Sequence, residues 1–349
     1  MNLKKERRPE MESNKNLIYK HYISLDWSME QVCLARMQAE SVEPTTKYFP
    51  PDVSRIKKYL KELQGKKILT IEETTGSHWL YAEILESVDK VLICDPYRNS
   101  LLKEGPKNDK IDARKLCLLL RSGMLKEVYH SSSEDYKIRK LANAYIALVK
   151  SGVRIKNQNS ALYRGEGLRY KKDKVKKEDK ILSFIEEQQK RSIIFYEEEK
   201  KRYEKLFKEI SRRNEIIKML CQVSGIKDTS AIKIYSVVID GRRFASKYKY
   251  WSMCGLVNHE RESGRRNYGR KKPRYSRILK SVYKNAALAA IRGNNDIREY
   301  YEILLQKGYT ISEARNQITR YIAKVTYAIL KNQIPYRAYQ WRELKKVSA

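Results

Sequence analysis

Two carboxylates, Asp109 and Asp112, stand three residues apart at the start of an apolar-periodic segment. If that segment is a helix, both lie on nearly the same face, one turn apart. Acids in the first turn commonly cap a helix and complement its dipole, so this pair alone does not define a site. Upstream, Asp26 and Glu73 each end a segment with strand character. Four acids converging on one point would form a site for hard divalent cations.

Two divalent cations about 4 Å apart are the common device for phosphoryl transfer on nucleic acids: one activates the attacking oxygen and the other stabilises the leaving oxygen. We therefore predict that Asp26, Glu73, Asp109 and Asp112 are catalytic and bind metal, with two Mg²⁺ per site and Mn²⁺ as the alternative ion. Glu72 competes with Glu73, because a one-residue change of strand register moves a side chain to the other face of a sheet.

The arginine-rich segment 259–277 is a second candidate region. It holds eight Lys or Arg against two Glu, together with two glycines, and we expect a loop that contacts phosphates. Ser263, next to Gly264, could be held against a phosphate by guanidinium groups and act as a nucleophile. His259 is a candidate general base, although a loop histidine is more often structural or solvated. For a single loop serine, phosphate contact without chemistry is the commoner interpretation. The predicted nucleic-acid-binding residues are Lys107, Arg261, Arg265, Arg266, Arg270, Lys271, Lys272 and Arg274.

The charge of the chain points to a polyanionic partner. Lys and Arg number 74 against 42 Asp and Glu, a formal net charge of +32, which favours nucleic acid over a membrane. Residues 1–130 carry 23 basic and 19 acidic side chains, whereas residues 211–349 carry 30 and 10. The five cysteines are isolated, which supports neither a zinc module nor a disulfide framework. No apolar run could span a membrane, and the polar N-terminus lacks a signal core, so we expect a cytoplasmic, nucleoid-associated protein.

The elements that must position the acids follow from the hydrophobic periodicity. Predicted strands cover residues 19–26, 31–38, 45–49, 67–71 and 90–94, and predicted helices lie between Asp52 and Gly65, at 77–87 and at 109–121. A hairpin entry followed by alternating strands and helices predicts a mixed sheet flanked by helices. The same order occurs in RNase H-like folds. It would bring the two strand ends and the helix start together.

In the remainder of the chain the hydrophobic periodicity predicts mainly helices. Residues 132–165 and about 180–220 form two long charged helices, which indicate a helical hairpin or coiled coil, or else an ordinary helical linker. Further helices are expected at about 276–292, 295–306 and 311–332. The predicted domains are a disordered basic arm at 1–16, an α/β catalytic domain at 17–130, a coiled-coil region at 131–215 and a mostly α-helical domain with the serine loop at 216–340.

Several short segments together resemble a known family. They are LDWS around Asp26, EETTG with Glu73, DPYR at 95–98, KNDKIDARKL at 107–116, VSGI at 223–226, RRFAS at 242–246, CGLV at 254–257, ESG at 262–264 and ARNQITRYIAKVTYAILK at 314–331. On these motifs the chain resembles the DEDD transposases of bacterial and archaeal insertion sequences, the insertion-sequence 110 class, which is related to the Piv DNA invertases. Two places depart from the pattern: Lys227 stands where a second glycine is usual, and Arg270 to Ser276 replaces a Ser-Lys-x-Gly-Asn run.

The resemblance implies a RuvC-like, RNase H-like N-terminal domain whose metal tetrad is Asp26, Glu73, Asp109 and Asp112. It implies that Ser263 attacks the DNA backbone and forms a transient phosphoserine bond. It also implies a homodimer or homotetramer in which one subunit's tetrad meets another's serine, and a non-coding bridge RNA that guides the choice of DNA. A Piv-type invertase, a RuvC-like junction nuclease that uses the acids alone, and a non-catalytic nucleic-acid-binding protein are the alternatives.

Overall fold

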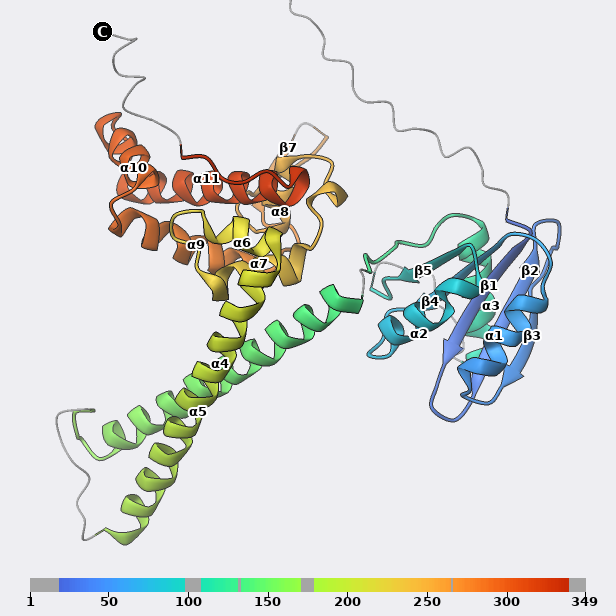
Figure 1. Ribbon diagram of the computed structural model, residues 1–349, viewed down its shortest axis with the longest axis horizontal. Coiled ribbons are helices and arrows are strands. Elements are labelled where there is room, and N and C mark those ends of the chain that lie inside the picture. Colours follow the sequence, from blue (N-terminus) through green and yellow to red (C-terminus); the bar gives the residue numbers. More distant parts are fainter. Residues whose placement is uncertain (1–18, 98–107, 131–132, 171–178, 265, 339–349) are drawn as a thin grey trace, which may run out of the picture. The chain divides into compact units, whose positions relative to one another are not determined.

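The computed structural model describes residues 19–97, 108–130, 133–170, 179–264 and 266–338. The chain divides into two compact units, Met1–Ser131 and Ser132–Ala349, each of which is described by itself (Figure 1). The predicted N-terminal arm and two predicted DNA-binding residues, Lys107 and Arg265, lie outside the described residues.

A mixed five-stranded sheet forms the centre of the first unit, with strand order β3-β2-β1-β4-β5. The strand β1 is antiparallel to β2 and parallel to β4, β2 is antiparallel to β3, and β4 is parallel to β5. The sequence prediction of a mixed α/β sheet is therefore confirmed. The strands are β1 (His21–Trp27), β2 (Val32–Gln38), β3 (Thr45–Phe49), β4 (Lys67–Glu72) and β5 (Lys90–Cys94).

Helices cover both faces of this sheet. On one face, α1 (Val53–Glu62) and α2 (Ser77–Ile84), followed by the short helix η1 (Leu85–Ser87), pack on apolar strand residues such as Ile23 and Leu25. On the other face, α3 (Asp109–Arg121) buries Ala113 against β2. The Ser24 hydroxyl of β1 donates a hydrogen bond of 2.6 Å to the Ala113 carbonyl oxygen. Because strand side chains alternate, Asp26 lies on the same face as Ser24, toward α3.

Two long helices, α4 (Ser133–Gly165) and α5 (Lys180–Arg213), run antiparallel in the second unit (Figure 1). The Tyr145 hydroxyl donates to Glu204 at 2.9 Å. The prediction of one helix up to about residue 220 is wrong, because Asn214 interrupts it. The Asn214 side chain accepts a hydrogen bond of 3.0 Å from the Ile217 amide and so begins the separate helix α6 (Glu215–Cys221).

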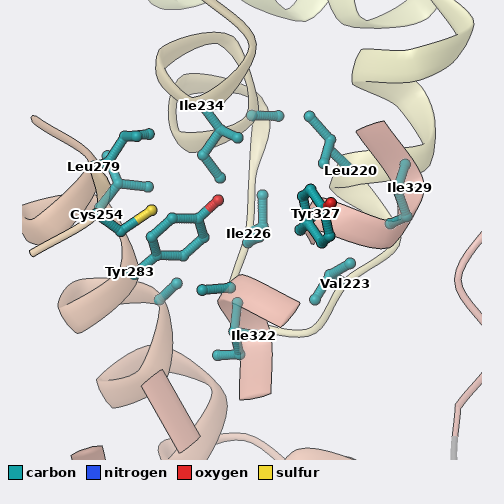
Figure 2. Packing of buried hydrophobic residues seen from close by; sticks show 14 of the residues in the cluster. Leu220, Val223, Ile226, Ile234, Cys254, Leu279, Tyr283, Ile322, Tyr327 and Ile329 are labelled. Atoms are coloured by element: carbon teal, nitrogen blue, oxygen red, sulfur yellow. The ribbon is translucent and has the colours of Figure 1, made fainter. Parts of the chain in front are cut away.

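The second unit is otherwise mainly helical around one apolar core. Figure 2 shows Leu220, Val223 and Ile226 packed among residues of the later helices, including Tyr283 and Tyr327. The prediction of a loop over 259–277 is wrong in part, because this segment contains a β-hairpin. The elements are α7 (Asp228–Val238), η3 (Gly241–Arg243), α8 (Lys247–Met253), β6 (His259–Ser263), β7 (Arg266–Lys271), α9 (Arg277–Arg292), α10 (Asp296–Gln306) and α11 (Ile311–Asn332).

Gly225 allows the turn between α6 and α7 to lie directly against α9. Its φ is +85°, and a Cβ at this position would stand 2.2 Å from the Ala286 carbonyl oxygen. Any side chain there would therefore combine backbone strain with a clash against main-chain atoms.

We expect Gly225→Ala to destabilise the second unit more than Gly308→Ala. Gly308 has nearly the same φ, +83°, but open space around it. Gly308→Ala is the control, and it should lower the free energy of unfolding by about 1–2 kcal/mol through backbone strain alone. Gly225→Ala should cost about 1–3 kcal/mol more, because overpacking is added. Urea unfolding followed by helical circular dichroism measures both, and equal losses would contradict the packing argument.

Candidate functional site

The acids at the start of α3 do not serve as its N-cap. Asn108 is the cap, since its side-chain oxygen accepts a hydrogen bond of 2.9 Å from the Lys110 amide. Asp109 is exposed. The Oδ1 atom of Asp112 is buried and, within the described part of the chain, has no hydrogen-bond partner. A buried carboxylate oxygen without a partner is costly, so the capping explanation does not account for this residue.

Asp26 near the end of β1 has an unusual environment. The pKa of its carboxyl is raised from 3.8 to about 6, mainly by burial and in addition by the negative charges of Asp109, Asp112 and Glu72. Both effects disfavour the ionised carboxylate. The structure therefore brings three of the four predicted tetrad acids into one electrostatic group, and it adds Glu72.

The sheet register explains why Glu72 and not Glu73 lies beside Asp26. Leu25 of β1 pairs with Ile71 of β4 in parallel, so the residues that follow them point to the same face of the sheet. Glu72 ends β4 and is half-buried, whereas Glu73 follows the strand and is exposed. Glu73 is not among the groups that raise the pKa of Asp26. The role of Glu73 as a ligand stays a prediction, and its competitor Glu72 holds the inner position.

The acids do not form a complete cage. Among the residues that the structure describes, no group of three or more His, Cys, Asp or Glu side chains could hold a metal ion by itself. Magnesium fits a sparse site, because it keeps several waters and is usually bound by one or two carboxylates together with substrate phosphates. The unpartnered oxygen of Asp112 and the raised pKa of Asp26 fit a site of this kind.

Ser263 lies at the tip of the β6–β7 hairpin in the second unit. It pairs with Arg266 across a two-residue turn whose first residue, Gly264, has φ +56°. All the described residues of both strands are exposed. An ion pair of 3.0 Å between Glu260 and Arg270 joins the strands near their other ends. The hairpin thus presents the serine to solvent among cationic side chains.

The position of His259 fits a structural histidine better than a general base for Ser263. His259 begins β6, pairs with Lys271, and its Nε2 atom lies 3.1 Å from the Ser252 hydroxyl. Ser263 lies four positions further along β6, a span of about 13 Å at the usual rise of 3.3 Å per residue. A base for this serine must come from elsewhere.

The other predicted nucleic-acid contacts in this region are accessible. The side chains of Arg261, Arg266, Arg270, Lys271, Lys272 and Arg274 are all exposed, as a phosphate-contacting surface requires. The hairpin lies in the second unit, and the acids lie in the first.

Residues 217–302, which include the whole hairpin, match a family of DNA-transposing enzymes. The matching family model is described as Transposase IS116/IS110/IS902 family, and this similarity agrees with the resemblance seen in the sequence. A comparison with curated proteins finds no match. Among the helices that the structure describes, none is both long and apolar enough to cross a membrane.

We expect Asp26→Asn to stabilise the first unit at pH 8 and to have less effect at pH 4. A raised pKa means that the folded state holds the proton more tightly than the unfolded chain. This contribution is fully present below pH 3.8 and is lost as the pH rises through about 6. The full shift corresponds to about 3 kcal/mol, and solvent screening of a half-buried group reduces the expected gain to about 1 kcal/mol.

Chemical unfolding of the Asp26→Asn protein at the two pH values measures this difference. Glu73→Gln, which removes an exposed acid outside the group around Asp26, is the matched control. An equal gain at pH 4 and pH 8 would show that charge repulsion around Asp26 is not the cause.

Proposed function

We propose that this protein is a transposase or site-specific recombinase of an insertion sequence, in which a metal-dependent acid site and Ser263 together cut and rejoin DNA. The observation that carries the proposal is the transposase-family match across the hairpin that bears Ser263. The formal charge of +32 suits a DNA partner. The order of the mixed sheet and the acids on its α3 face support the RNase H-like interpretation of the first unit.

In this proposal Asp26, Glu72, Asp109 and Asp112 hold Mg²⁺, or Mn²⁺ in its place. When bound, these ions would polarise the phosphate and stabilise the charge that develops on its oxygens. Asp26 must lose its proton to ligate a cation, and its pKa of about 6 makes metal affinity rise with pH through that range. The oxygens of Asp112 and Asp26 are the ligands that the described geometry favours.

In the same proposal the Ser263 oxygen attacks a backbone phosphorus. The bond from Oγ to phosphorus forms as the bond from phosphorus to one sugar oxygen breaks, and that sugar oxygen takes up a proton. Exposed guanidinium groups such as that of Arg266 would hold the phosphate. The serine proton must pass to an acceptor other than His259, because His259 is at the opposite end of β6.

A second copy of the chain and a guide RNA belong to the proposal through the family resemblance. The net positive charge of residues 131–210, with 21 basic and 13 acidic side chains, is compatible with an RNA partner. The junction nuclease is the second candidate, because the acids form a group within the first unit without Ser263.

We expect Glu72→Gln to abolish metal-dependent DNA cleavage and Glu73→Gln to preserve most of it. Removing a ligand beside Asp26 should lower the cleavage rate by at least about 100-fold, the upper range for loss of a metal-site partner. The measurement is cleavage of DNA that carries the ends of the matching element, in Mg²⁺ and in Mn²⁺. The opposite pattern would assign the metal ligand to Glu73.

We expect Ser263→Ala to abolish the covalent protein–DNA adduct and the joining of strands. The adduct is measured by its altered migration after denaturation of the protein. Ser281→Ala, at an exposed position on α9, is the matched control and should behave as the wild type. Cleavage that continues in Ser263→Ala without strand joining would favour the junction nuclease over the recombinase.

A further inference from the structure

A positively charged cavity of about 250 Å³ lies next to the base of the β6–β7 hairpin. Four cationic side chains and two amides line it, and no acidic side chain is among its described lining residues. The cationic residues are Lys272, Lys280, Lys284 and Arg320, and the amides are Asn258 and Asn316. A polar pocket with this charge suits an anion that accepts several hydrogen bonds.

Two packed helices carry four of these side chains. Lys280 and Lys284 stand one turn apart on α9, and Asn316 and Arg320 stand one turn apart on α11. Both helices belong to the core shown in Figure 2. Arg320 donates through Nε to the Leu256 carbonyl oxygen at 3.3 Å. A guanidinium has five N–H donors, so this bond fixes the group and leaves further donors for a ligand.

Two of the ammonium groups approach each other closely. The neighbouring Lys272 lowers the pKa of Lys280, and burial acts in the same direction. The Lys280 ammonium also stands over the Tyr275 ring, 4.8 Å from its centroid. A Cβ on Gly255 would lie 2.5 Å from that ring, so Tyr275 packs directly on the chain at Gly255. Like charges held together in this way repel, and an anion between them would remove the repulsion.

The surroundings of the cavity indicate which anion fits. Asn258 immediately precedes β6, and Lys272 immediately follows β7, so the cavity adjoins the end of the hairpin opposite Ser263. The hairpin belongs to the segment that matches the transposase family. The span of about 13 Å from His259 to Ser263 is longer than the axial rise of 3.4 Å per nucleotide of a DNA strand, so the cavity and the serine would face different phosphates.

We propose that this cavity binds one backbone phosphate of the DNA strand, a different one from the phosphate that faces Ser263. The inference that the cavity binds a DNA phosphate is based on the cavity itself. The position of this phosphate relative to Ser263 rests on the proposed function. The cavity sets where the strand lies along the hairpin and so acts as a positioning site.

The first test compares Lys280→Gln and Lys284→Gln with Lys307→Gln in the full-length protein. Lys307 is exposed in the same unit and does not line the cavity. The assay is fluorescence anisotropy with a short labelled DNA duplex in EDTA at several salt concentrations. Each cavity variant should weaken binding by roughly 5- to 30-fold, and should reduce the slope of log K against log salt by about 1.

Equal, small effects of all three variants would overturn the proposal, since they would show only the general attraction of a basic protein. Because Lys284 is exposed, its variant tests the cavity even if Lys280→Gln fails to fold. The assay contains no divalent ion and measures no cleavage. A protein that binds as expected but never cleaves DNA would contradict the proposed function and leave the phosphate site standing.

The second test locates the phosphate and separates DNA from a free anion. Single neutral methylphosphonate linkages are placed along the strand, and the affinity of each duplex is measured. One linkage should weaken binding to the wild type but not to Lys280→Gln. If no linkage does so, while inorganic phosphate raises the melting temperature of the wild type and not of Lys280→Gln, the cavity is a free-phosphate site and the DNA assignment is wrong.

Discussion

The contact between α3 and the sheet is the constraint on which the acid site depends. Ala113 and Cys117 are fully buried in this interface, and the Ser24 hydroxyl fixes the Ala113 carbonyl oxygen at 2.6 Å. With the helix held there, its first turn directs Asp109 and Asp112 toward the end of β1. The mutual repulsion of the carboxylates opposes this arrangement, and burial of the apolar helix face offsets it.

Much of the first unit could be predicted from sequence because its strands and helices have clear periods. Apolar and polar residues partly alternate in β1, which indicates one buried face, and the apolar run of β4 indicates two. The choice between Glu72 and Glu73 could not be made with the same assurance. Both follow Ile71, and only the pairing of Leu25 with Ile71 decides which one shares a face with Asp26.

The second unit shows where sequence patterns fail. The β6–β7 hairpin has polar residues on both faces, so it lacks the alternation that marks a half-buried strand. Asn214 interrupts a continuous helical period through its own side-chain hydrogen bond, an effect that hydrophobic spacing does not reveal. The cavity near Lys280 was equally hidden, since it needs residues from the segments that flank the hairpin, from α9 and from α11, which only tertiary packing brings together.

The exposed hairpin has a mechanical consequence for the serine at its tip. A two-stranded ladder without a buried face is only marginally stable on its own, and here it is anchored at the end where α8 and α9 meet the core. Such a support is compliant. In the proposed reaction, the tip of the hairpin would follow the phosphate as bonds break and form. In this unit the packed helices of the core are the rigid part, whereas the hairpin extends from them into solvent.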